Sequence, residues 1–139
     1  MTCFVVLDTN VLVSALLSEK DDAATVCVLE MVLKGELTPV YSSAISDEYR
    51  EVLLRKKFGF SVELVEFLLE TIKKGGISVE PEPSGVKLTD MKDLPFYEVA
   101  LEMRGSDAFL VTGNTKHFPD EAFIVTPREL LTILGAERT

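Results

Sequence analysis

Short runs of apolar residues alternate along the chain with longer segments in which apolar residues recur every three or four positions. The runs at residues 4–7, 38–41, 77–79, 109–111 and 123–125 predict five β-strands. The periodic segments predict helices over residues 11–17, about 22–34, 44 to about 57, 61–74, about 95–103 and 127–134. Strands that alternate with helices indicate a parallel sheet covered on both faces. We therefore expect an α/β three-layer sandwich with a five-stranded, mainly parallel sheet.

Length and charge limit what this sandwich can do. The 139 residues, without an internal repeat or linker, predict one domain over residues 1–139. The two cysteines, Cys3 and Cys27, are expected to be small core residues. With no signal peptide or apolar run long enough to span a bilayer, we expect a cytoplasmic protein without a membrane partner. A formal net charge of -9 repels bare nucleic acid, so a nucleic-acid substrate would need local basic groups or bound cations.

Three acidic residues stand at positions where a charge is unexpected. Asp8 ends the first apolar run, where a parallel strand presents side chains to ligands, and it is equally suited to cap the following helix. Glu48 lies at the edge of the apolar stripe of the third helix; either it takes part in a site or it turns outward to a neighbouring base. Asp93 stands at the start of the fifth helix, where it can cap the helix, bind a cation or do both.

A fourth position resembles the first. Asn114 ends the segment Thr112-Gly113-Asn114 after the fourth strand, as Asp8-Thr9-Asn10 follows the first strand. Its carbonyl oxygen can bind a hard cation directly or hold a coordinated water. Asp107, which precedes the same strand, is expected to be an ordinary turn residue.

Three converging acids would repel one another unless a cation neutralised them. Hard divalent ions select oxygen ligands, and the chain has a single histidine, His117, which excludes a histidine-rich zinc site. The expected cofactor is therefore Mg2+ or Mn2+. Such ions activate water and orient phosphodiesters, and the chain has no glycine-rich phosphate loop, nucleophilic triad or dinucleotide motif that would indicate another reaction. The sequence thus indicates a hydrolase that acts on phosphodiester bonds.

Four segments in this order carry a family resemblance. They are Leu7-Asp8-Thr9-Asn10-Val11-Leu12, Glu48-Tyr49-Arg50-Glu51-Val52-Leu53, Asp93-Leu94-Pro95-Phe96, and Leu110-Val111-Thr112-Gly113-Asn114 followed by Lys116-His117-Phe118-Pro119. Together they resemble the PIN-domain ribonuclease family, and most closely the branch of toxin components of toxin–antitoxin pairs. The similarity runs nearly from end to end and includes the terminal segment Thr126-Pro127-Arg128-Glu129-Leu130-Leu131.

The resemblance implies a five-stranded parallel sheet and an endoribonuclease that depends on Mg2+ or Mn2+. Asp8, Glu48 and Asp93 would be the metal-binding catalytic acids. Asn114 would complete the site, and because many members carry an aspartate there, one and two metal ions both stay open. The resemblance also implies an RNA substrate, a homodimer and an antitoxin protein as partner. We expect weaker substrate contacts from the following residues: Thr9, Asn10, Thr112, Lys116 and His117.

Two other interpretations fit parts of the sequence. A catalytically weak PIN-like domain that acts mainly through partner binding is favoured by Asn114. A phosphoryl-handling α/β domain, either a receiver or an aspartate-nucleophile phosphatase, ranks lowest. The phosphatase would require a second acid where the chain has Asn10, and the receiver would require adjacent acids after the first strand.

Overall fold

Five parallel strands form a single sheet in the order β3-β2-β1-β4-β5. The computed structural model describes residues 3–138, with side chains described for residues 3–135. Residues 1, 2 and 139, the ends of the expected 1–139 domain, lie outside the described part. The strands are β1 (Phe4–Leu7), β2 (Thr38–Tyr41), β3 (Ile77–Ser78), β4 (Ala108–Val111) and β5 (Ile124–Val125). The predicted α/β class and five-stranded parallel sheet are confirmed.

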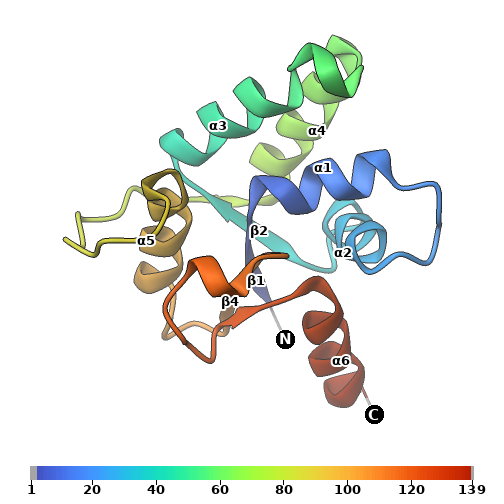
Figure 1. The fold of residues 1–139 in the computed structure, drawn as a ribbon. Helices are drawn as coiled ribbons and strands as arrows, with labels where there is room; N and C mark the ends of the chain where they lie inside the picture. Colours follow the sequence, from blue (N-terminus) through green and yellow to red (C-terminus); the bar gives the residue numbers. More distant parts are fainter. Residues whose placement is uncertain (1–2, 139) are drawn as a thin grey trace.

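Within the described residues 3–138, six helices surround this sheet. They are α1 (Thr9–Leu17), α2 (Ala24–Leu33), α3 (Ser43–Leu53), α4 (Val62–Gly75), α5 (Leu94–Glu102) and α6 (Pro127–Arg138). In Figure 1, α5 lies on one side of β1 and β4, α2 and α6 lie on the other, and α3 and α4 run side by side. Three short 3-10 turns complete the fold: η1 (Lys56–Phe58), η2 (Met91–Asp93) and η3 (Thr115–His117). Within residues 3–138, no helix has the length and apolar character needed to cross a membrane.

Several element boundaries differ from the sequence prediction. Helix α1 begins at Thr9 instead of residue 11, because Asp8 caps it. Helix α3 ends at Leu53 instead of about residue 57, because Arg55 adopts an extended backbone and the next residues form η1. The last helix continues beyond residue 134 to Arg138. Strands β3 and β5 are each one residue shorter than predicted, and β4 is one residue longer.

Few of the buried side chains are polar. Val5, Val6 and Leu7 of β1 are at most 1% exposed, as expected for a central strand covered on both faces. Among the residues whose side chains are described, only four buried ones are polar or charged: Asp8, Thr9, Ser42 and Thr112. All four lie at the carboxyl ends of strands: Asp8 and Thr9 after β1, Ser42 after β2 and Thr112 after β4. Since buried polar groups need partners, this edge of the sheet is where the fold departs from simple packing.

Replacing Gly76 with alanine is expected to destabilise the fold by roughly 2 kcal/mol, a typical cost of overpacking. A Cβ atom at Gly76 would lie 2.5 Å from the backbone oxygens of both Ile72 and Pro39, so α4 or β2 would have to move. Urea unfolding measures the change. Gly75→Ala is the matched control, because a Cβ there meets no atom within 4 Å and is expected to leave stability nearly unchanged. Equal unfolding midpoints for the two variants would contradict this account of Gly76.

Candidate active site

The strand order places the carboxyl ends of β1 and β4 next to each other. From β1 the chain adds β2 and β3 on one side and β4 and β5 on the other, so the direction of winding changes between β1 and β4. Ligands of open α/β sheets bind beside such a change, outside the carboxyl ends of the strands. Leu7 is in register with Val111, and the Asp8 N–H donates to the Val111 carbonyl at 2.9 Å. Asp8 and Thr112 are therefore neighbours at this edge.

Asp8 is held by two hydrogen bonds. The Thr112 hydroxyl donates to its Oδ2 at 2.7 Å, and the Asn10 backbone N–H donates to its Oδ1 at 3.4 Å. Burial raises the pKa of the Asp8 carboxyl, and these hydrogen bonds lower it in part. Capping and participation in a site, the two interpretations that the sequence left open, are thus compatible for Asp8.

Glu48 approaches Asp8 from α3. The Thr9 hydroxyl donates to the Glu48 Oε2 at 2.5 Å, and the side chain is half-buried instead of turning outward to a base. Burial raises the pKa of Glu48, and the negative charge of Asp8 raises it further. Asp8 and Glu48, whose negative charges repel each other, form the first part of an acidic cluster.

Asp93 completes the cluster from the start of α5, the helix that packs against α3. It is the last residue of η2 and makes no side-chain capping bond to α5, so capping alone does not explain it. Its Oδ2 is buried without a hydrogen-bond partner and lies 3.6 Å from the His117 Nδ1. Burial raises the pKa of Asp93 to about 6, with a further contribution from Asp8. A buried carboxylate oxygen without a donor is costly, and a cation would satisfy it.

Asn114 lies at the margin of this cluster. Its backbone N–H donates to the Thr112 hydroxyl oxygen at 3.0 Å, whereas its exposed side chain makes no hydrogen bond within the described side chains of residues 3–135. Asn10 and Lys116 are also exposed at this edge. Asp107 has a φ of 54° just before β4, at the opposite end of the strand, as expected for a turn residue.

Two residues near the cluster were not among the sequence-predicted site residues. The Tyr49 hydroxyl donates to the Leu7 carbonyl at 2.6 Å. Because Tyr49 belongs to the apolar stripe of α3, the sequence indicated only a core residue at this position. The positive charge of Lys92 lowers the pKa of Glu48 and so lies near it. Lys92 directly precedes Asp93 in the sequence, and this was the signal that could have indicated its place near the cluster.

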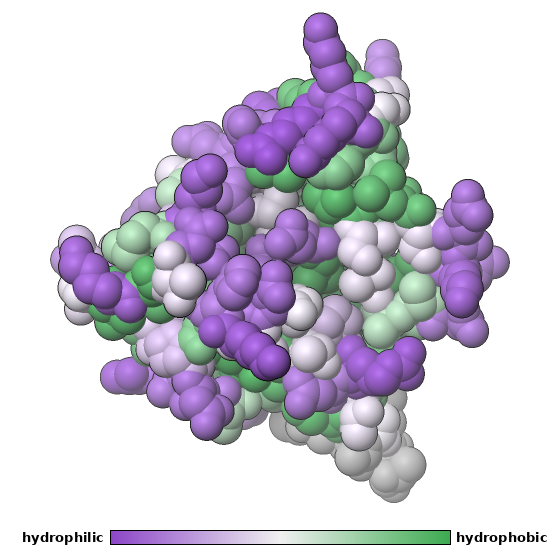
Figure 2. All heavy atoms as spheres, viewed as in Figure 1, coloured by the Kyte–Doolittle hydropathy of each residue, from purple (hydrophilic) through white to green (hydrophobic). Residues whose placement is uncertain are grey.

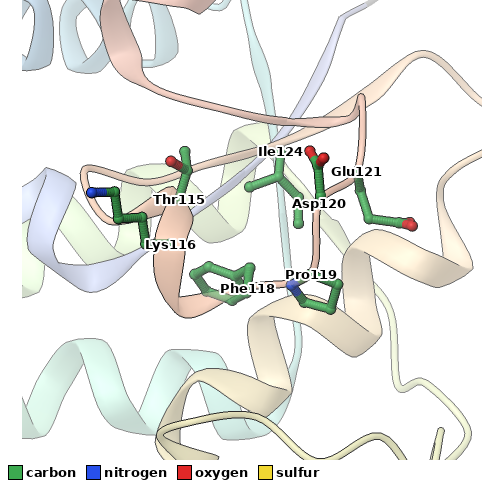
Figure 3. A pocket seen from close by; sticks show the side chains of 7 residues that line it. All are labelled: Thr115, Lys116, Phe118, Pro119, Asp120, Glu121 and Ile124. Atoms are coloured by element: carbon green, nitrogen blue, oxygen red, sulfur yellow. The ribbon is translucent and has the colours of Figure 1, made fainter.

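A pocket of about 240 Å³ lies beside η3 (Figure 3). In this view Thr115 and Lys116 lie on one side and Asp120 and Glu121 on the other. The full lining is Thr115, Lys116, Phe118, Pro119, Asp120, Glu121 and Ile124. It contains none of the three clustered acids, so this pocket is distinct from the acidic site.

The donor set of the acidic site fits a hard divalent cation by its chemistry. The three side chains offer carboxylate oxygens only, and Asp93 has one oxygen that no protein donor satisfies. As placed, no three acidic, histidine or cysteine side chains of the described part surround a single point closely enough to coordinate one ion. The cluster is therefore suited to a cation in charge and ligand type, with side-chain positions that are not yet those of a closed coordination sphere.

A family model described as the PIN domain matches residues 4–116 of the 139. The match extends from β1 into η3 and includes the three acids, Thr112 and Asn114. Comparisons with curated proteins and with solved structures give no match. PIN domains are in general nucleases that bind RNA and use divalent metal ions. The chain, with this match over most of its length, belongs to the PIN-domain family.

Proposed function

We propose that this protein is an endoribonuclease that depends on Mg2+ or Mn2+ and hydrolyses RNA phosphodiester bonds. The observation that carries the proposal is the buried Oδ2 of Asp93, which accepts no hydrogen bond, in a cluster where the charge of Asp8 opposes ionisation of both Glu48 and Asp93. A fold keeps such a costly arrangement when something else neutralises it. In a PIN domain, that role suits a divalent cation.

The acids and their neighbours have separable roles in this proposal. Asp8, Glu48 and Asp93 would hold the ion, with Asn114 as a further oxygen ligand. When bound, the ion would supply an activated water and stabilise the charge that develops on the phosphate. The Thr112 and Thr9 hydroxyls already donate to Asp8 and Glu48, so they fix the carboxylates before any ligand arrives.

Contacts to RNA require cationic groups, because the chain as a whole carries a formal net charge of -9. Lys92 and Lys116 are cations that the structure brings beside or directly after the cluster, and the His117 imidazole lies beside Asp93. The hydroxyls of Thr9 and Thr112 are buried and directed at carboxylates, so we assign these two residues to positioning. Asn10, Lys116 and His117 remain as the proposed contacts with the substrate.

Lys116→Ala is expected to raise the KM for RNA about threefold to tenfold, because one phosphate contact is removed. The side chain is exposed, so the free energy of unfolding is expected to stay within about 0.5 kcal/mol of the wild-type value. Steady-state cleavage kinetics measure the effect. Lys56→Ala removes the same charge from η1 and serves as control. If both variants cleave with wild-type kinetics, Lys116 does not contact the substrate.

The direct test is an RNA cleavage assay with Mg2+ or Mn2+, repeated after chelation. Cleavage that needs the metal and returns on its addition is expected. Purified, folded protein that cleaves no RNA in a broad panel under any metal condition would overturn the proposal. Titration calorimetry with Mn2+ alone would then test for the cation site independently of catalysis.

We further propose that the protein is the toxin of a toxin–antitoxin pair and forms a homodimer. The proposal is supported by exposed apolar side chains on α4, where Val62 is 59% and Phe67 is 62% exposed. Figure 2 shows hydrophobic residues gathered beside α4 and α1 on an otherwise largely hydrophilic face. Such groups are typical of protein-binding surfaces. The same surface favours the second candidate function, a weakly catalytic domain that acts mainly by binding a partner, which predicts metal-independent partner binding and little cleavage.

A further inference from the structure

We propose that Tyr49 is a positioning residue of the acidic site and that its hydroxyl sets the separation of Asp8 and Glu48. Tyr49 is 2% exposed, and its hydroxyl donates to a backbone carbonyl instead of to one of the clustered carboxylates. Its effect passes through the backbone carbonyl of Leu7, the residue before Asp8. This inference rests on the proposed metal-dependent function.

Two hydrogen bonds join the residues on either side of Asp8 to the middle of α3. The Tyr49 hydroxyl donates to the Leu7 carbonyl at 2.6 Å, and the Thr9 hydroxyl donates to Glu48 at 2.5 Å. One bond runs from α3 to β1 and the other from the start of α1 to α3. We call this pair of bonds the β1–α3 clamp. The clamp involves residues next to both acids: Asp8 lies between Leu7 and Thr9, and Glu48 is itself bonded and directly precedes Tyr49.

The Leu7 carbonyl needs a partner that the sheet does not provide. Strand β1 pairs with β2 only over Phe4 and Val5, whereas the pairing with β4 continues to Leu7. The Asp8 N–H points to β4, so the carbonyl of Leu7 points to the opposite side, beyond the paired part of β2. The Tyr49 hydroxyl occupies this position and satisfies a buried backbone acceptor.

Tyr49 also reaches the segment that carries the third acid. Its ring lies 6.2 Å, centroid to centroid, from the ring of Phe96 in α5, the helix that follows Asp93. The hydroxyl of Tyr49 thus contacts the segment of Asp8, its ring contacts the segment of Asp93, and its backbone adjoins Glu48. One buried side chain connects all three acid-bearing segments.

Packing alone would not fix the spacing of these acids. Asp8 and Glu48 repel each other, and apolar contacts between α3 and the sheet are non-directional, so they permit small sliding movements. A buried hydrogen bond restricts both distance and direction. Residues that hold metal ligands in place through such bonds commonly change metal affinity or activity 10-fold to 100-fold when mutated.

Tyr49→Phe tests the inference, because it keeps the ring and its contact with Phe96 and removes only the hydroxyl. At pH 7.5 the Kd for Mn2+, measured by titration calorimetry, is expected to rise about tenfold. We expect kcat for RNA cleavage to fall by a similar factor, while the KM for RNA stays unchanged because the cationic contacts are intact. Tyr97→Phe is the matched control. Tyr97 is buried, as Tyr49 is, but it lies in α5 and packs on Phe118 and Phe123.

Thr9 provides a second test of the clamp if Tyr49→Phe folds poorly. Thr9→Val removes the hydroxyl that reaches Glu48 and is expected to weaken Mn2+ binding about tenfold, whereas Thr9→Ser keeps a hydroxyl and is expected to bind more tightly than Thr9→Val. Wild-type Mn2+ affinity in folded Tyr49→Phe, or equal affinities for the two Thr9 variants, would overturn this inference but leave the proposed function standing. Wild-type protein that neither binds Mn2+ nor cleaves RNA would overturn the inference and the proposed function together.

Discussion

Asp8→Asn is expected to reduce metal-dependent RNA cleavage by on the order of a hundredfold or more, because an amide replaces the charge of the central acid. Asparagine has nearly the same shape and is also a good helix cap, so α1 is expected to form as in the wild type. Glu48→Gln is expected to give a loss of similar size. Cleavage rates at saturating Mn2+ measure both effects, and urea unfolding confirms that each variant is folded.

Asp107→Asn is the matched control for these substitutions. It makes the same chemical change at an exposed turn before β4, where the backbone φ of 54° suits asparagine well. Wild-type cleavage is expected for this variant. Wild-type cleavage in both Asp8→Asn and Glu48→Gln would show that the acidic cluster does not carry the reaction.

Asp93→Asn is expected to stabilise the metal-free protein at pH 7 by about 1 to 2 kcal/mol while it removes cleavage. The pKa of Asp93 is raised to about 6 by burial and by neighbouring acids, so the folded protein binds this proton more tightly than the unfolded chain does. The stability gained from the protonated carboxyl is fully present below about pH 3.8 and is lost as the pH rises through about 6. One pKa unit corresponds to about 1.4 kcal/mol, and solvent contact and the buried amide reduce the net gain.

Urea unfolding of chelated protein between pH 4 and pH 7.5 checks this expectation. The wild type is expected to lose stability over that range by about 2 kcal/mol more than Asp93→Asn. Addition of Mn2+ at pH 7.5 is expected to stabilise the wild type and leave Asp93→Asn nearly unchanged. Asp47→Asn, on the exposed face of α3, controls for the loss of one negative charge. Parallel stability–pH curves for the wild type and Asp93→Asn would contradict the raised pKa of Asp93.

The sequence was sufficient to predict the sheet because its signals are local. The apolar run of β1 belongs to a strand buried on both faces, and Ser61 caps α4 by accepting a hydrogen bond from the Leu64 N–H. The end of α3 was predicted wrongly, because residues 55–57 have good helix propensity and only the tertiary fold gives Arg55 an extended backbone. Boundaries of this kind depend on packing that no short window contains.

The site was predictable only in outline, since its parts come from distant segments. Asp8, Glu48 and Asp93 were identified as charges at unfavourable positions, and the structure brings them into one electrostatic cluster. The bond from Thr112 to Asp8 joins residues 104 positions apart, which no local pattern indicates. Tyr49 was hidden for another reason: a tyrosine in an apolar stripe looks like a core residue, and only the position of its hydroxyl reveals the contact with Leu7.

The central place of β1 in the sheet has a consequence for synthesis on the ribosome. Of the strands, the chain makes β1 first, but β4 and the following Thr112, which orients Asp8, are made only about one hundred residues later. Until then β1 has an unpaired edge, and the cluster lacks both this hydroxyl and His117. Contacts so distant in sequence also slow folding, because the long loop between them must be closed first. A nascent chain beside messenger, transfer and ribosomal RNA therefore cannot assemble its acidic site until the segments that carry Thr112 and His117 have been translated.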